Sequence, residues 1–426
     1  IHFSLDLHRP GIEGGIKVGV LADVYEMLNT CGKCGFCHGA CKTYKKDGAE
    51  YMVARGRVQL IKALADGKIE ADQFYEDAIN SCLLCGECAV ACPSGVRGHE
   101  LVLAARRDLK LRKGIKPFAK SFALKSLTKP GRLSFGFGFF AGTGKKWIDR
   151  IGLQFVRGID VKNMPAFKKS FVQQVPEVVT VPNPKKRVAF FVGCFLNHSL
   201  INTAHSVVKV LTKNDVEVTI PRDQPCCGLP QYVYGDFESA KAQAMKVMDI
   251  FDRHEAIITA CGSCASMLKK EMVELFKDDP KNKEKAEKFA AKCYEFSEYV
   301  AKELDTVSKF HNSIPITVTY HDPCHMVRYN KITAEPRSLL KSVPRLKFVE
   351  MFEADRCCGA AGLVQAFYHD LSAQITADKA QNIINTGAQV VATSCPACML
   401  KINSGLKLKG SNIEIKHVAD VLASAL

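Results

Sequence analysis

The pattern of apolar and polar positions changes along this chain of 426 residues. In the first 110 residues, apolar side chains recur at helical intervals, as in 21–28 and 58–64, and short loops with cysteines separate these stretches. Beyond residue 184, apolar residues instead form short continuous runs that are typical of buried strands, and helical stretches follow them. This alternation predicts α/β units around mainly parallel sheets, with ligands carried at the strand ends.

Four of the strand-like runs lead directly to cysteines. The runs 187–194 and 316–324 each deliver a single cysteine, and 256–260 and 388–393 end at C-x-x-C pairs. The same cysteine pattern is written twice, because corresponding cysteines of the two copies lie 130 to 134 residues apart. An internal duplication is the simplest interpretation.

These patterns together predict an α+β multidomain chain. We expect a helical domain at 1–110, a connector rich in Phe, Pro and basic residues at 111–184, and two duplicated α/β domains at 185–310 and 311–426. Each duplicated half has an ordinary domain size.

The net charge of +15 is concentrated in one part of the chain. Residues 101–190 hold 20 lysines and arginines against four acidic residues, so this segment carries +16 and the rest of the chain about −1. Such a concentration indicates a docking surface for an acidic partner protein or anionic lipid headgroups. Nucleic acid is disfavoured because no sequence motif for binding it accompanies the charge.

The 19 cysteines suit metal chemistry better than disulfides, since a chain of this length can build its own hydrophobic core. The sequence opens with no charged-then-apolar signal segment, and no apolar run is long enough to span a bilayer. We therefore expect a cytoplasmic protein that associates with membranes only peripherally, through partners.

Two cysteine runs near the N-terminus have the spacing C-x2-C-x2-C-x3-C, with which bacterial ferredoxins hold [4Fe–4S] clusters. Three cysteines of a run share one cluster, and the fourth usually ligates the other cluster. We predict one cluster on Cys31, Cys34, Cys37 and Cys92, and a second on Cys82, Cys85, Cys88 and Cys41. Structural zinc is the alternative, although zinc sites usually present two separated C-x-x-C pairs.

The duplicated halves each offer five cysteines, one more than a zinc ion or a cubane cluster needs. The first set is Cys194, Cys226, Cys227, Cys261 and Cys264, and the second is Cys324, Cys357, Cys358, Cys395 and Cys398. The glycines after the adjacent pairs, Gly228 and Gly359, would allow the bend that turns both thiols toward one cluster. A cubane cluster with a spare cysteine, a larger open cluster and a vicinal disulfide all remain possible interpretations.

The two halves resemble the cysteine-rich CCG domains of heterodisulfide reductase catalytic subunits, of glycolate oxidase and D-lactate dehydrogenase iron–sulfur subunits, and of the anchoring subunit of anaerobic glycerol-3-phosphate dehydrogenase. The segments that carry the resemblance are 192–194, 226–230, 261–264, 321–325, 357–362 and 394–398. In the N-terminal part, 34–37, 54–57 and 92–96 are most similar to the glycolate oxidase type. The resemblance implies one or two further iron–sulfur clusters in the CCG domains, with noncubane [4Fe–4S] clusters allowed.

The sequence has no dinucleotide fingerprint, so we expect an electron-relay subunit of a respiratory redox complex. A flavoprotein dehydrogenase or a membrane quinone or cytochrome partner would exchange electrons with the CCG clusters through the N-terminal clusters. The alternative is a catalytic thiol–disulfide reductase of the heterodisulfide reductase kind, with the second five-cysteine set as its catalytic residues.

Four residues near these motifs have less specific signals. His198, His321 and His325 lie close to cluster cysteines in the sequence and could supply protons, although hydrogen-bonding core or surface histidines are the more common case. Cys293 belongs to no spacing group and is expected to be a buried structural thiol.

Overall fold

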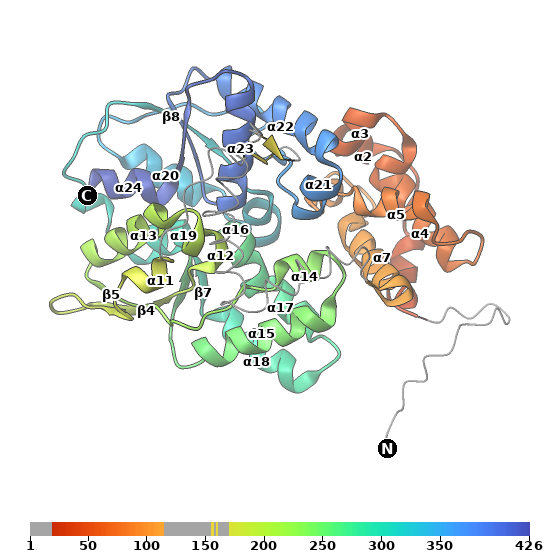
Figure 1. Cartoon of the computed structure of the whole chain (residues 1–426), viewed down its shortest axis with the longest axis horizontal. Coiled ribbons are helices and arrows are strands. Elements are labelled where there is room, and N and C mark those ends of the chain that lie inside the picture. The colour runs from red at the N-terminus through yellow and green to blue at the C-terminus, as the bar shows by residue number, and fades with distance from the viewer. Residues whose placement is uncertain (1–18, 115–154, 157–158, 161–169) are drawn as a thin grey trace. The chain divides into compact units, whose positions relative to one another are not determined.

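The computed structural model describes residues 19–114, 155–156, 159–160 and 170–426 (Figure 1). Backbone contacts divide the chain into two compact units, Ile1–Gly114 and Ile115–Leu426. Most of the expected connector at 111–184 lies outside the described residues. The proposed domain boundaries at 110, 184 and 310 therefore stay predictions.

The first unit is built from short helices, as its apolar pattern predicts. They are η1 (Ala22–Val24), α1 (Tyr25–Asn29), α2 (Phe36–Ala40), α3 (Lys42–Asp47), η2 (Glu50–Met52), α4 (Ala54–Ala65), α5 (Gln73–Asn80), α6 (Glu87–Val90) and α7 (Gly98–Lys113). Helix α4 packs on α1 and α7. Its apolar face supplies Val58 and Ile61 to a small core, in which Leu28, Ile79 and Leu101 are also buried.

The buried side chain of Arg57 links several segments of this unit by hydrogen bonds. The Arg57 guanidinium donates hydrogen bonds to the carbonyls of Ala78 (2.7 Å) and Met52 (2.5 Å) and to the hydroxyl of Ser81 (3.0 Å). The preceding residue must be a glycine, because a Cβ atom on Gly56 would lie 2.0 Å from a backbone oxygen. The segment 54–57, which carried part of the resemblance, thus has a structural role. It packs closely on residue 50 and bonds the chain just before Cys82.

The second unit contains two modules, each with its own sheet. In the first module the strand order is β3 (Val178–Val179), β5 (Val216–Thr219), β4 (Lys186–Phe190), β6 (Ile257–Thr259) and β7 (Cys293–Glu295). All neighbours are parallel except β3 and β5. The helices are α11 (Phe171–Gln174), α12 (Gly193–His198), α13 (Ile201–Lys213), α14 (Leu229–Val233), α15 (Phe237–Phe251), α16 (Gly262–Ser266), η4 (Met267–Glu271), α17 (Met272–Leu275), α18 (Pro280–Ala291), α19 (Phe296–Glu303) and η5 (Val307–Lys309).

The second module has an all-parallel sheet in the order β11 (Glu414–His417), β10 (Val390–Thr393), β8 (Thr317–His321) and β9 (Lys347–Phe348). Its helices are η6 (His325–Asn330), α20 (Ala334–Ser342), α21 (Gly362–Phe367), α22 (His369–Ile384), α23 (Pro396–Leu408) and α24 (Val418–Ala425). The four predicted strands at the cysteine motifs correspond to β4, β6, β8 and β10. A short antiparallel pair, β1 (Phe155–Val156) and β2 (Ile159–Asp160), completes the described strands of this unit.

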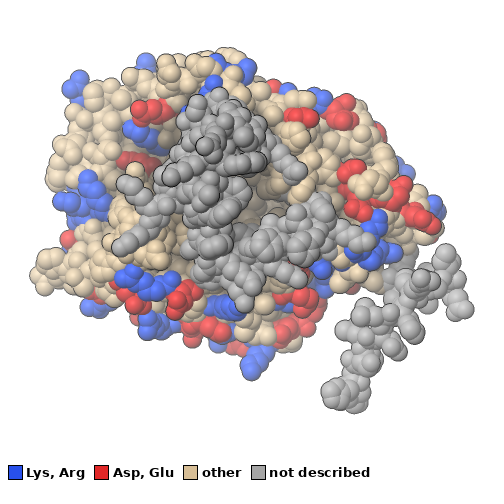
Figure 2. Space-filling view, viewed as in Figure 1, with Lys and Arg blue, Asp and Glu red and all other residues tan. Residues whose placement is uncertain are grey.

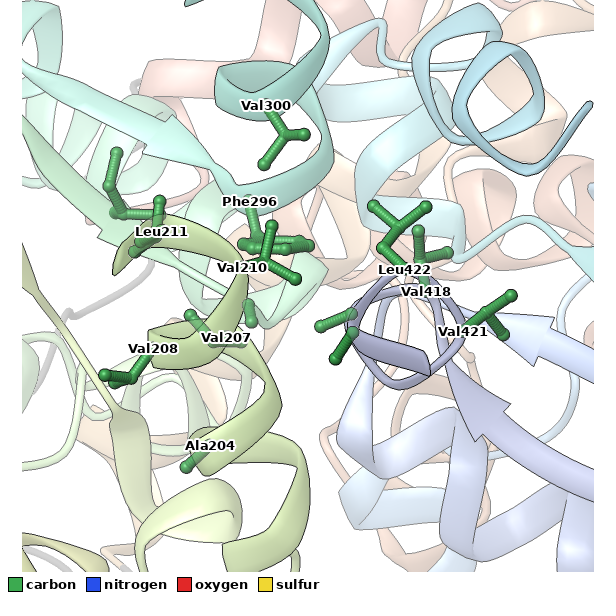
Figure 3. Close-up of a cluster of buried hydrophobic side chains, with 14 of the residues drawn as sticks. Ala204, Val207, Val208, Val210, Leu211, Phe296, Val300, Val418, Val421 and Leu422 are labelled. Carbon is green, nitrogen blue, oxygen red and sulfur yellow. The ribbon is translucent and has the colours of Figure 1, made fainter. Parts of the chain in front are cut away.

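One hydrophobic core runs through both modules. Helix α13 of the first module packs against α24 of the second, and Val207, Leu211, Val418 and Leu422 are buried in this contact (Figure 3). The side chain of Thr203 also donates a 3.0 Å hydrogen bond across it to a carboxylate of α24. Because strands and helices of both copies line the same core, the duplicated halves form a single packed body.

Much of the described part of the basic segment is neutralised within the chain. Twelve of the 20 basic residues of 101–190 lie outside the described residues. Among the others, five form ion pairs with acidic side chains, namely Arg112, Lys113, Lys185, Lys186 and Arg187. Lysine and arginine side chains alternate with acidic ones on the described surface shown in Figure 2.

Candidate iron–sulfur centres

A pocket of the first unit gathers the cysteines that we assigned to one ferredoxin cluster. Cys31, Cys34, Cys37 and Cys92 all line it, and Cys88 contributes to its wall. The first run and Cys92 are 51 residues apart at their closest, so the fold brings the crossed fourth cysteine to the other three. This gathering supports the ligand assignment, which remains a prediction.

Polar groups hold the backbone around this pocket. Arg55 donates to the carbonyl of Lys33 (3.0 Å) and to the carboxylate of Glu50 (2.6 Å), which also lies 2.8 Å from a ring nitrogen of His38. The Arg55 hydrogen bond lowers the pKa of Glu50 to about 2. The backbone amide of Arg55 donates to the sulfur of Cys37, a type of contact that tunes cluster potentials, while burial raises the pKa of that thiol.

Cys88 of the second ferredoxin set lies close to cysteines of both sets. Burial raises the pKa of this thiol to about 12, and the charges of Cys82, Cys41 and Cys37 add to the rise. The sulfur of Cys41 also lies 3.1 Å from the hydroxyl of Thr43. Cys85 stands in the loop between α5 and α6, half-buried.

The first CCG set forms a continuous group of thiols at the ends of β4 and β6. Hydrogen-bond contacts link Cys194 to Cys226, Cys226 to Cys227, Cys227 to Cys264 and Cys264 to Cys261. The hydrogen bonds that Cys264 donates to its two thiol neighbours, together with burial, raise its pKa well above the usual value.

The thiols of the second CCG set are grouped in a similar way. Cys398 contacts both Cys358 and Cys395, and Cys324 contacts Cys357. The hydrogen bond from Cys324 lowers the pKa of Cys357 to about 7, and the amide of Gly359, 3.4 Å from the same sulfur, helps.

Both CCG turns have the predicted bend. The φ angle is +92° at Gly228 and +87° at Gly359, a region that residues with a Cβ atom rarely adopt. In each turn the glycine amide donates to the sulfur of the first cysteine of the pair. All 19 cysteines lie in the described ranges and none of them forms a disulfide, so the vicinal disulfide interpretation finds no support.

The two CCG sets meet, which the sequence did not predict. The thiols of Cys261 and Cys395 are in hydrogen-bond contact, and the hydroxyl of Ser263 lies 3.5 Å from the Cys395 sulfur and 3.3 Å from Nδ1 of His325. The backbones approach closely here, because the amide of Gly262 donates a 2.9 Å hydrogen bond to the carbonyl of Ser394 of the other module. A Cβ atom on Gly262 would also lie 2.6 Å from the side chain of Met326. The ten cysteines therefore form one array within the second unit.

This array fits iron–sulfur clusters by its chemistry. Eight of its ten cysteines are buried, and several of their thiols have strongly raised pKa values because they crowd one another away from water. Iron ions bind deprotonated thiolates and supply the positive charge that such a buried group needs. Cys293, in contrast, is buried in β7 and donates to the carbonyl of Phe289 in the preceding helix α18 (3.3 Å), as expected of a structural thiol.

One residue of the array was considered in the sequence only as a source of protons. A ring nitrogen of His321, at the end of β8, lies within 4.8 Å of the sulfurs of Cys358 and Cys398. Burial lowers the pKa of His321 well below its usual value, so its ring is neutral. The signal that could have drawn attention to it is the duplication, since the corresponding residue of the first module is Phe191.

Comparison with protein families gives two matches. The cysteine-rich domain CCG matches residues 188–269 and 318–403, and a 4Fe-4S dicluster domain matches 27–96. These matches favour iron–sulfur clusters over zinc at the cysteine sites.

Several known proteins are similar over most of this chain. A probable glycolate oxidase iron-sulfur subunit of Bacillus subtilis is 32% identical over 95% of both chains. A fumarate reductase (CoM/CoB) subunit of Methanothermobacter marburgensis is 26% identical over 93% of this chain and 72% of its own length. Lactate utilization protein A 1 of Bacillus cereus is 34% identical over 56% of this chain and 99% of its own.

A solved structure supports the fold. The crystal structure of a hypothetical protein from Helicobacter pylori superposes with a TM-score of 0.54 at 11% identity, covering 95% of this chain and 76% of that one. At this identity the likeness concerns the fold alone.

Proposed function

Because this chain belongs to the family of iron–sulfur proteins that join a 4Fe-4S dicluster domain to two CCG cysteine-rich domains, we propose that it is the electron-relay subunit of a respiratory redox complex. The observation that carries the proposal is the gathering of its cysteines. Five ferredoxin cysteines line one pocket, with Cys41 and Cys82 near the fifth, Cys88, and ten form the joined CCG array. Clusters at these positions would accept and release electrons one at a time.

The proposed partner on one side is a flavoprotein dehydrogenase, and on the other a membrane quinone or cytochrome subunit. The names of the Bacillus relatives, which mention glycolate oxidase and lactate utilization, favour a 2-hydroxyacid dehydrogenase as the flavoprotein. No helix among the described residues is long and apolar enough to cross a bilayer. We propose that the basic segment 101–190 is the docking surface, and 12 of its 20 basic residues lie outside the described ranges.

Anaerobic reduction tests the relay. The protein would be purified without oxygen together with its flavoprotein, and cluster absorbance followed after addition of glycolate or D-lactate and then of a quinone. We expect bleaching by the hydroxyacid and recovery with the quinone, and no bleaching when the flavoprotein is omitted. Clusters that stay oxidised in the complete mixture would contradict the relay.

The contact between the two CCG sets favours a second candidate, a thiol–disulfide reductase. Two electron carriers that touch at Cys261 and Cys395 could together supply the two electrons that a disulfide needs. The reaction would be R–S–S–R′ + 2 e⁻ + 2 H⁺ → RSH + R′SH, with Cys324, Cys357, Cys358, Cys395 and Cys398 as the catalytic set. One relative is named a fumarate reductase (CoM/CoB) subunit.

The two candidates differ in what the purified chain does alone. With reduced viologen as the electron source, a disulfide reductase would form free thiols from an added heterodisulfide at a rate proportional to enzyme concentration. A relay would oxidise only the small amount of viologen that reduces its own clusters, and it would turn over only after its partner and acceptor are added.

A further inference from the structure

The side chain of His321 is built into the second CCG set. It is 1% exposed, ends strand β8 and stands three residues before Cys324. One of its ring nitrogens and the sulfurs of Cys358 and Cys398 all lie within 4.8 Å of one another. These three atoms come from three different segments, and an ion among them would be within reach of each.

The hydrogen bond on the other ring nitrogen decides which tautomer is present. Nδ1 of His321 lies 3.1 Å from the carbonyl oxygen of Ala354. A carbonyl only accepts, so Nδ1 carries the proton, and the neutral ring has its lone pair on Nε2. Lys379 donates to the same carbonyl (3.2 Å) and to that of Glu353 (2.5 Å), which fixes the loop that orients the ring.

The lone pair on Nε2 has no hydrogen-bond partner among the described residues, although the atom is buried. Buried polar atoms are normally satisfied, and an exception in a native fold points to something that binds there. Histidines that bind metals typically donate their second N–H to a carbonyl or carboxylate, which is the arrangement of His321.

Another buried histidine near the array shows the opposite arrangement. Nδ1 of His417 accepts a 3.1 Å hydrogen bond from the amide of Ala419, so its proton is on Nε2. That ring has no lone pair to offer on Nε2. His321 is thus distinguished from His417 by its tautomer, and from Phe191 of the first module by its chemistry.

We propose that Nε2 of His321 is a ligand to an iron of the cluster held by the second CCG set. This inference rests on the proposed function, in that it needs an iron–sulfur cluster at these cysteines. A neutral imidazole brings no negative charge, and histidine ligation raises the potential of iron–sulfur centres relative to all-cysteine ligation. The two CCG clusters therefore differ, and the second is the better electron acceptor.

Pulsed electron paramagnetic resonance on the unaltered protein tests the ligand directly. The protein would be prepared with natural histidine and with ¹⁵N-histidine, and samples poised at a series of potentials. We expect a strong nitrogen coupling that changes with the isotope in one cluster species, and this species should be missing in Cys398→Ser but present in Cys264→Ser. Absence of any histidine-dependent coupling would overturn the proposal, even if no variant folds.

Two variants sharpen the test. His321→Phe copies the first module and should remove the coupling and lower the potential of the second CCG cluster. His417→Asn keeps an acceptor for the Ala419 amide and should leave both unchanged. Coupling that persists in His321→Phe would overturn the ligand assignment. Iron sufficient only for the two ferredoxin clusters would overturn the proposed CCG clusters as well, whereas full iron without histidine coupling would overturn this inference alone.

Discussion

The two units place their cysteines in opposite environments. In the first unit Cys34 is exposed and the other seven cluster cysteines are half-buried, in short helices and the loops between them. In the second unit eight of the ten are buried, in the two glycine turns and the two C-x-x-C segments, and only Cys194 and Cys324 are half-buried. Clusters near the surface exchange electrons readily with partners, whereas burial and contacts to the sulfurs set the potential of deeper ones. The difference suits electron exchange with partners in the first unit, and clusters whose reduction potential is set by the protein in the second.

Removing a ligand gives the largest effect and tests the comparison most directly. Cys398→Ala should lower the iron content by roughly four ions per chain and destabilise the second unit, because it leaves a buried array incomplete. Cys34→Ala should lower iron by a similar amount and leave the second unit's unfolding unchanged, since this cysteine is exposed. Iron and sulfide analysis with thermal unfolding measures both.

The matched control for this pair is Cys293→Ala, which removes a buried thiol outside the clusters. It should leave the iron content unchanged. Loss of iron in this variant would mean that burial alone, rather than ligation, explains the effect of Cys398→Ala.

The next effect concerns the first unit, in which the buried Arg57 side chain is hydrogen-bonded to several segments. Arg57→Met should destabilise that unit by about 4 kcal/mol, because it leaves the carbonyls of Ala78 and Met52 buried without their charged donor. Denaturant unfolding followed by cluster absorbance measures it. Lys68→Met, at an exposed position, should cost less than about 0.5 kcal/mol, and equal costs for the two variants would refute the role of Arg57.

A buried carboxyl should make the second unit sensitive to pH. Burial raises the pKa of Glu271 to about 7, from an ordinary value of 4.5. Between these pH values the folded state holds a proton on Glu271 that the unfolded chain releases. The contribution of this proton to the free energy of unfolding is complete below pH 4.5 and is lost as pH rises towards 7. The loss amounts to about 3 kcal/mol.

Glu271→Gln keeps the size of the side chain and removes its titration. We expect the stability of this variant to fall less steeply between pH 5 and 7.5 than that of the unaltered protein. The remaining fall comes from Glu295 of the same unit, because burial raises the pKa of that carboxyl to about 8. Parallel pH profiles for the two proteins would contradict the assignment.

The smallest effect separates the two CCG turns. A Cβ atom on Gly359 would lie 2.7 Å from a backbone oxygen of Ser372, whereas one on Gly228 would meet nothing closer than 3.4 Å. Both alanine variants bear the cost of a positive φ, about 1 kcal/mol, and Gly359→Ala should cost about 1 to 2 kcal/mol more. Gly362→Ala, which has open space, is the control.

Local features of the sites were predictable because local sequence determines them. The strands β4, β6, β8 and β10 follow from runs of apolar residues, and the bends at Gly228 and Gly359 follow from the need to turn two adjacent thiols to one side. The clustering of Cys92 with the first ferredoxin run followed from its spacing pattern.

Features that depend on packing between distant segments were not predictable. The contact of Cys261 with Cys395 arises from the way two sheets pack, and a repeat pattern carries no information on that. The tautomer of His321 depends on a carbonyl 33 residues away. The ion pair of Lys186 with Glu303 likewise joins segments 117 residues apart. The net charge of segment 101–190 therefore overstated the positive charge that its described part leaves for a partner.

Because the two duplicated halves share a core through α13 and α24, they should not be separable in evolution. Two tandem copies usually remain separable, so that one can be deleted, exchanged or moved to a second gene. Here each copy would expose valines and leucines if it were made alone, and the cysteines at the seam would lose their neighbours. A split of the coding sequence near residue 311 should therefore give active protein only when both pieces are produced in the same cell and assemble.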